Sequence, residues 1–82
     1  MQPVYKKITT LDRMKIGEKA KVRRLLGNGN KRRRLAEMGI TPNTDISVKR
    51  IAPLGDPIEI SVRSYELSLR YEDARWIEIT LE

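Results

Sequence analysis

Short runs in which apolar and polar residues alternate are the feature that most constrains the fold of this chain. The alternation covers five segments, which are residues 18–26, 46–49, 58–63, 65–70 and 77–81. Turn-forming residues separate these runs roughly every ten residues, a spacing typical of a small barrel or sandwich. Alternation with a period of two buries one face of each strand and leaves the other in water. The pattern therefore predicts a mainly β fold, and five such strands can close into a small barrel without exposed edges.

A short helix is expected between the first and second of these strands. The turn at residues 27–30 contains Asn28 and Asn30, and either can cap a helix N-terminus. Residues 31–38 read as two helical turns, which Gly39 can end in a left-handed conformation. Shorter features complete the pattern: a turn at residues 11–13, a type II turn with positive φ at Asn43, a tight reversal at Ser64 and one helical turn at residues 71–76.

The length of 82 residues is enough for one domain. We expect residues 1–82 to form a single domain in which residues 1–8 are an N-terminal extension. Within that extension, Val4, Tyr5 and Ile8 could add an edge strand or belong to a loose tail. The composition, 39% hydrophobic and 34% charged, is that of a folded chain.

The lack of recognisable targeting segments and of cysteine favours a cytoplasmic location. No apolar run approaches the roughly 18 residues that a membrane span needs. Lys6 and Lys7 are not followed by the apolar stretch of a signal peptide. Cysteine is absent, so the chain lacks the disulfides that often stabilise small secreted domains. These features predict a cytoplasmic location.

Histidine is absent as well, which removes the commonest general base and a common ligand of soft metal ions. Without His or Cys, a zinc or copper site cannot be built in the usual way. Carboxylates remain, but Glu72 and Asp73 are a lone adjacent pair. The glycines near Asn28 lack the third glycine and the Lys-Ser/Thr pair of a phosphate-binding loop. We therefore expect no enzyme activity, no catalytic residue, no cofactor and no resident metal ion.

Positive charge is concentrated in the first part of the chain. Residues 1–34 hold twelve Lys or Arg against two acids, whereas residues 35–82 hold five against nine. The most basic segment is Lys31, Arg32, Arg33 and Arg34, at the expected N-terminus of the helix, where the helix dipole favours anions instead. Residues that break a local rule are often functional. The run indicates contact with an acidic protein surface or phosphate; the alternative is a solvated basic face beside a turn.

Three apolar residues are candidates for a protein contact. Leu35 and Met38 lie three apart on one helix face, so they either pack the helix onto the sheet or remain at the surface. Leu54 lies in the turn between Pro53 and Gly55, which does not itself need an apolar residue. An exposed Leu-Met patch would mark a site of protein interaction.

Several segments resemble one known family. They are Gly17-Glu18 with Ala20 and Val22, the run from Arg34 to Ile40 (Arg-Leu-Ala-Glu-Met-Gly-Ile), Pro42, the run from Pro53 to Ile60 (Pro-Leu-Gly-Asp-Pro-Ile-Glu-Ile), Arg63, the run from Tyr65 to Arg70, and Ala74. In this order and spacing the sequence resembles the bacterial ferrous-iron transport A proteins, FeoA, over nearly all of residues 9–82. The chain departs from the family at Asn43 and Ser64, where glycine is frequent.

The resemblance implies an SH3-like five-stranded barrel with a short inserted helix, in a cytosolic protein. It also implies a partner, the cytosolic part of the GTP-dependent ferrous-iron permease, through which the protein would be peripheral to the membrane. We expect the partner-binding residues to be Lys31, Arg32, Arg33, Arg34, Leu35, Met38, Leu54 and Asp56. A homo-oligomer is compatible with these features.

Two other functions fit the residues. The basic first part would suit a small nucleic-acid-binding β-barrel, although Tyr5 is the one aromatic residue among its cations and single-strand binders interleave several. We therefore expect no nucleic-acid partner. A regulatory module that grips a peptide in a groove, as SH3 domains do, is the third reading.

Overall fold

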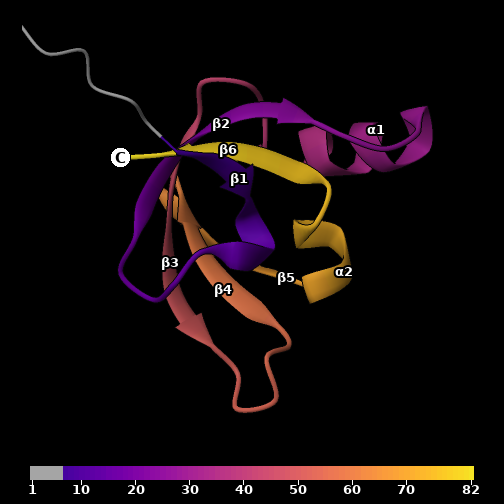
Figure 1. Cartoon of the computed structure of the whole chain (residues 1–82). Coiled ribbons are helices and arrows are strands. Elements are labelled where there is room, and N and C mark those ends of the chain that lie inside the picture. Colours follow the sequence, from indigo (N-terminus) through magenta and orange to yellow (C-terminus); the bar gives the residue numbers. More distant parts are fainter. Residues whose placement is uncertain (1–6) are drawn as a thin grey trace, which may run out of the picture.

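The alternating segments form the strands of one antiparallel sheet. The chain is described by a computed structural model that covers residues 7–82, and Figure 1 shows its elements. The strands are paired in the order β1-β6-β2-β3-β4-β5. In chain order the elements are β1 (Ile8–Thr10), the 3-10 helix η1 (Leu11–Arg13), β2 (Lys19–Leu25), α1 (Gly29–Glu37), β3 (Asp45–Ile51), β4 (Ile58–Val62), β5 (Tyr65–Leu69), α2 (Tyr71–Ala74) and β6 (Ile77–Leu81).

The expected five strands are present as β2 to β6, and the inserted helix is present as α1. A sixth strand, β1, pairs with β6 and brings Ile8 opposite Thr80. Ile8 therefore lies in an edge strand, whereas Val4 and Tyr5 fall outside the described residues. The edge strands β1 and β5 are not hydrogen-bonded to each other, so the curled sheet stays open in its pairing. Because β1 has three residues, it offers few backbone N–H and C=O groups for hydrogen bonding to a further strand.

The core lies inside this curled sheet and follows from the alternation. In β4, the side chains of Ile58, Ile60 and Val62 are buried, while Glu59 and Ser61 between them are partly exposed. Burying one such side chain contributes about 1.5–3 kcal/mol. A slip of one residue in register would expose the whole set, so the pattern determines which face is inside. The other buried apolar residues are Leu11, Met14, Ala20, Val22, Leu35, Ile40, Ile46, Val48, Leu69, Ala74, Ile77 and Ile79.

The boundaries of α1 follow from its capping residues. The Asn28 side chain accepts a hydrogen bond from the Lys31 backbone N–H at 2.9 Å, so the helix begins at Gly29, two residues earlier than expected. Gly39 adopts a φ of +92° just after the helix, which confirms the predicted left-handed stop.

The turns before β3 and after β4 also contain left-handed residues. Asn43 has a φ of +71°, as predicted for the turn after Pro42. In the two-residue loop between β4 and β5, Arg63 adopts the positive φ of +55° and Ser64 does not. A positive φ at the first loop residue is the pattern of a type II′ turn, which matches the twist of the flanking strands. The departure of this chain from glycine at position 64 therefore causes no strain there.

Two small helices lie beside the sheet. Leu35 is 1% exposed and fixes α1 against the core. The one-turn helix α2 makes the corner between β5 and β6, and its Ala74 is buried. Figure 1 shows α1 and α2 on the same side of the molecule, while the β3–β4 loop projects away from the sheet.

Candidate partner-binding surface

The basic run lies inside α1 rather than at its N-terminus. Because the helix begins at Gly29, Lys31 falls in the first turn and Arg34 in the last turn, where the dipole favours cations. The predicted conflict with the helix dipole is therefore wrong for Arg34, whereas Lys31 remains in the first turn. Helical spacing divides the four cations between two faces. Lys31 is partly buried, whereas Arg32 and Arg33 are exposed and form no ion pair within residues 7–82.

Asp73 of α2 holds the inner face of α1. Its Oδ1 accepts a hydrogen bond from Lys31 Nζ at 3.1 Å, and its Oδ2 lies 3.6 Å from an Arg34 guanidinium nitrogen. The side chains of Lys31 and Asp73 are only 23% and 13% exposed. Two of the four predicted partner-binding cations are thus also structural, because they join α1 to α2.

Trp76 stands between cations from two segments. Lys31 Nζ lies 5.8 Å from the centre of the indole ring, and the Arg75 guanidinium carbon lies 6.0 Å from it. These distances suit cation–π attraction. The ring is partly buried and packs against the core. In the sequence, Tyr5 is the one aromatic residue within the basic first part of the chain. No local pattern indicates the contact between Lys31 and Trp76, which are distant in sequence.

The apolar candidates separate into core and surface. Leu35 is 1% exposed, so it packs α1 onto the sheet and is not available to a partner. Met38 is partly buried and packs against the core, and its carbonyl accepts a hydrogen bond from the Tyr65 hydroxyl. Leu54 is 97% exposed at the tip of the β3–β4 loop. Of these three, Leu54 presents its whole side chain to a partner.

Asp56 has a structural contact that the sequence did not indicate. Its Oδ1 accepts a hydrogen bond from the backbone N–H of Tyr71 at 2.9 Å. That N–H is at the start of α2, where Arg70 provides no side-chain cap. Asp56 thus caps α2 from another loop, and it holds the base of the β3–β4 loop against this helix.

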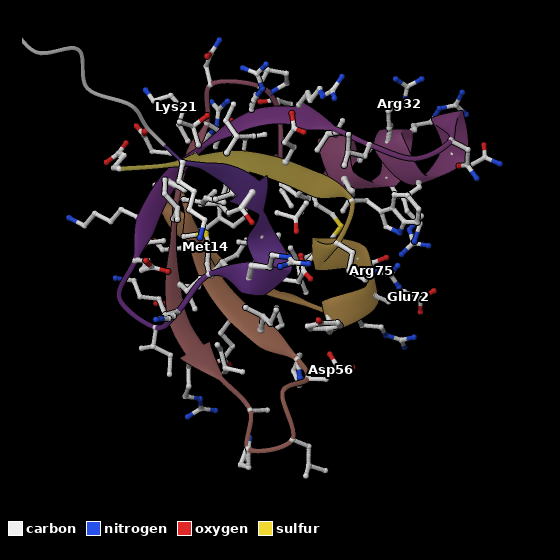
Figure 2. All side chains as sticks on the ribbon, in the orientation of Figure 1. Met14, Lys21, Arg32, Asp56, Glu72 and Arg75 are labelled. Atoms are coloured by element: carbon white, nitrogen blue, oxygen red, sulfur yellow. The ribbon has the colours of Figure 1, made fainter. Side chains whose placement is uncertain are left out.

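The helix α2 connects the two groups of candidate residues. Asp56 binds its first residue, and its Asp73 binds the cations of α1. In Figure 2 the labelled side chains of Arg32, Arg75, Glu72 and Asp56 follow one another along one side of the molecule. The structure therefore links α1 and the Leu54 loop through α2, without joining them into a single patch.

The exposed residues Arg32, Arg33 and Leu54 are suited to binding another protein. Within residues 7–82, no three carboxylates gather where they could hold a metal ion. Neither α1 nor α2, the α-helices in that part of the chain, has the length and apolar character that crossing a membrane requires. Exposed guanidinium groups and an exposed leucine offer charge and apolar area to another surface.

Known proteins with similar sequences and folds were compared with this chain. The sequence model of the FeoA domain matches residues 9–81. An Fe(2+) transport protein A/Fe(2+) transporter FeoB fusion protein of Porphyromonas gingivalis is 39% identical over 71 residues. This match covers 87% of the chain but spans only 8% of the length of that curated relative.

Solved structures agree with the sequence match. The FeoA-like protein from Clostridium acetobutylicum superposes with a TM-score of 0.85 at 36% identity, over 92% of this chain and 87% of that one. Stenotrophomonas maltophilia FeoA in complex with zinc, described as a procaryotic SH3 domain protein, gives a TM-score of 0.75 over 87% of this chain and 88% of that one. Its identity of 23% supports the fold alone, which is SH3-like as expected. Together with the match over residues 9–81, these similarities show that the chain belongs to the FeoA family, which is linked to ferrous-iron transport.

Proposed function

We propose that this chain is a non-enzymatic, cytosolic accessory protein of ferrous-iron uptake that binds the cytosolic part of the GTP-dependent permease FeoB and regulates it. The FeoA family is an accessory iron-transport family and not a known enzyme family. In the Porphyromonas gingivalis relative, FeoA and FeoB are parts of one fused protein. Fusion holds two partners at a high effective concentration, so it favours an association between them.

The exposure of Leu54 is the observation that carries this proposal. The side chain is 97% exposed at the tip of a projecting loop, and Pro53 beside it is exposed too. Covering an apolar side chain in this position with a partner removes its surface from water, which stabilises the complex. Asp56 holds the base of the loop against α2, so the tip is presented from a fixed support. Leu54 is therefore the main residue of the proposed apolar anchor, and Met38, which is partly exposed, adds to it, whereas the buried Leu35 is not part of it.

Arg32 and Arg33 are the proposed electrostatic part of the contact. Both side chains are exposed on the outer face of α1, and neither is neutralised by an ion pair within the described part of the chain. Exposed charges at the rim of an interface mainly accelerate encounter with a partner of opposite charge. The surface of the permease that faces α1 should therefore be acidic.

The test is calorimetric titration of this chain into the purified cytosolic region of the permease, with and without GTP, at physiological salt. We expect saturable one-to-one heat, and Leu54→Asp should raise the Kd about tenfold or more, as expected for an anchor residue. Ile16→Asp is the matched control, because Ile16 is 60% exposed on a different turn. An equal effect of the two variants, or none from Leu54→Asp, would remove Leu54 as the anchor. A difference between the two nucleotide states would place the contact near the GTPase.

Nucleic-acid binding is the second candidate, and the contact of Lys31 and Arg75 with Trp76 favours it. Cations beside an aromatic ring are the elements of a single-strand-binding surface. Such binding would weaken linearly with salt on logarithmic axes, with a slope that reports the number of phosphates contacted. Absence of heat with the permease, together with salt-dependent binding of an oligonucleotide, would replace the first proposal by this one.

A further inference from the structure

A groove lies at the opposite end of β4 from the Leu54 loop. Its volume is about 590 Å³. It runs along the first residues of β2 and β3 and the last residues of β4. Figure 2 shows Lys21, which lines the groove, far from Asp56 at the base of the Leu54 loop. The charged and hydroxyl-bearing residues that line it are Lys19, Lys21, Asp45, Ser47, Ser61, Arg63 and Glu82.

Arg63 reaches this groove from a backbone conformation that arginine rarely adopts. Its φ is +55°, in the first position of a two-residue loop. Glycine is the usual residue there, because a side chain in the left-handed region costs about 1–2 kcal/mol. A conformation of this kind persists where the surrounding structure holds it, and it is a reason to look for a function of the side chain.

Two threonine hydroxyls hold the Arg63 guanidinium in place. One of its terminal nitrogens donates to Thr41 Oγ1 at 3.2 Å and to Thr44 Oγ1 at 3.3 Å. These hydroxyls are themselves hydrogen-bonded at 2.9 Å, and Thr44 is only 3% exposed. No carboxylate pairs with Arg63 within residues 7–82. Arg63 lines the groove, and its Nε and Nη1 have no hydrogen-bond partner within residues 7–82, so these N–H groups are the ones that we expect a ligand there to meet.

The floor and rims of the groove limit the kind of ligand. Ser47 and Ser61 face each other across β3 and β4, and Lys19 continues the row on β2. Their hydroxyl and ammonium groups can bind the polar groups of a peptide. Asp45, paired with Lys21 at 3.4 Å, and Glu82 add negative charge at the rim. These two carboxylates disfavour a multiply charged phosphate chain, whereas a single carboxylate matches the single free guanidinium.

We propose that this groove binds a side-chain carboxylate of an extended protein segment, with Arg63 as its ion-pair and hydrogen-bond partner. The Nε–H and Nη1–H groups, which the threonines leave free, can donate charge-assisted hydrogen bonds to a carboxylate oxygen. Ser47 and Ser61 bind the neighbouring amide groups of the segment, and Lys19 adds attraction at the rim. The site is remote from Leu54, so it does not depend on the proposed function.

The first test is a titration of the isotope-labelled protein, followed by NMR, with N-acetyl-Gly-Glu-Gly-amide. N-acetyl-Gly-Gln-Gly-amide, which has the same shape without the charge, is the control ligand. We expect saturable shifts of the Arg63 side-chain Nε–H and of the Ser47 and Ser61 amides with the glutamate peptide, and affinity at least about tenfold weaker with the glutamine peptide. Equal binding of both peptides, shifts confined to α1, or tighter binding of inorganic phosphate would overturn the proposal.

Arg63→Gly separates binding from folding. Glycine tolerates the positive φ, and this relief offsets the lost threonine hydrogen bonds and the added freedom of the unfolded chain, so the urea midpoint should stay close to that of the parent. Its affinity for the glutamate peptide should nevertheless fall about tenfold or more, and Arg63→Lys should recover only part of it, because lysine keeps the charge but lacks the planar guanidinium that the two threonines orient. Arg13→Ala removes one charge from an exposed arginine outside the groove and should leave affinity unchanged. If Arg13→Ala weakens binding as much as Arg63→Gly, only net charge matters and the site is refuted.

Discussion

Gly39, which has no Cβ atom, lies where the end of α1 meets Tyr65 of β5. Its φ of +92° belongs to the left-handed region, where a side chain is disfavoured. In addition, a Cβ atom there would overlap the Tyr65 hydroxyl and stand 3.1 Å from Tyr65 Cζ. That hydroxyl donates to the carbonyl of Met38 at the end of α1. Glycine is thus favoured twice, because the backbone disfavours a Cβ atom there and a larger residue would have to move the Tyr65 hydroxyl away from the helix end.

Substitution of this glycine separates the two requirements. Gly39→Ala should lower the free energy of unfolding by about 2 kcal/mol or more, because backbone strain adds to displacement of Tyr65. Gly17→Ala is the control, since Gly17 has a similar φ of +90° but open space around its Cβ position. It should cost only the backbone part, about 1–2 kcal/mol. Urea denaturation of both variants measures the difference, and equal losses would mean that the Tyr65 contact contributes nothing.

At the scale of elements, α2 depends on its neighbours for its existence. A helix of four residues is far too short to be stable in isolation. It is maintained by the cap from Asp56, by the burial of Ala74 and by the pairing of Asp73 with α1. The same contacts fix the position of α1 and of the Leu54 loop, so α2 sets the geometry of the proposed partner surface.

The Asp73 contacts should therefore contribute measurably to stability. Asp73→Asn should lower the free energy of unfolding by about 1–2 kcal/mol, because it weakens charge-assisted bonds between partly buried groups. It should also speed hydrogen exchange of the α1 amides. Asp45→Asn disrupts an ion pair whose side chains are 47% and 74% exposed, and it should cost less than about 0.5 kcal/mol. Similar costs for the two variants would show that Asp73 does not hold α1.

At the scale of the whole molecule, the charge asymmetry of the chain becomes a basic side. The strand β2 and the helix α1, which carry many of the exposed cations, lie next to each other along the top of the molecule in Figure 1. The principal extents are 40 × 31 × 22 Å, and the Debye length is about 8 Å at physiological salt. Charges at one end are therefore screened from those at the other, and a partner near α1 experiences mainly the local cations.

Removal of two of these cations should slow association with an acidic partner. Arg32→Ala combined with Arg33→Ala should lower the association rate with the permease region about three- to tenfold at low salt, with little change in dissociation. Stopped-flow mixing at about 50 and 300 mM salt measures both rates, and the effect should shrink at the higher salt. The control is Lys15→Ala with Lys49→Ala, which removes the same charge from exposed residues elsewhere. An equal slowing by this pair would leave net charge as the cause.

Local sequence patterns were enough to predict the strands β2 to β6, the buried face of β4 and the family. Alternation within a segment places Ile58, Ile60 and Val62 on one face, and this information is local. Turn chemistry at Gly39 and Asn43 is local as well, and both adopt the predicted positive φ. The Leu-Ala-Glu-Met-Gly and Leu-Gly-Asp-Pro segments were enough to indicate the FeoA family. The alternation of apolar and polar residues and the φ preference of turn residues are properties of neighbouring positions in the chain, so these features could be predicted without coordinates.

Tertiary structure alone decided which candidate residues are free to bind. Leu35 and Leu54 are both apolar residues in short segments, yet one is buried and the other is exposed, because only α1 packs onto the sheet. The pairing of Asp73 with Lys31, and of Arg63 with Thr44, joins segments that are distant in sequence. Strand order and the corner at α2 bring these partners together. The alternation within one segment does not predict such contacts between distant segments.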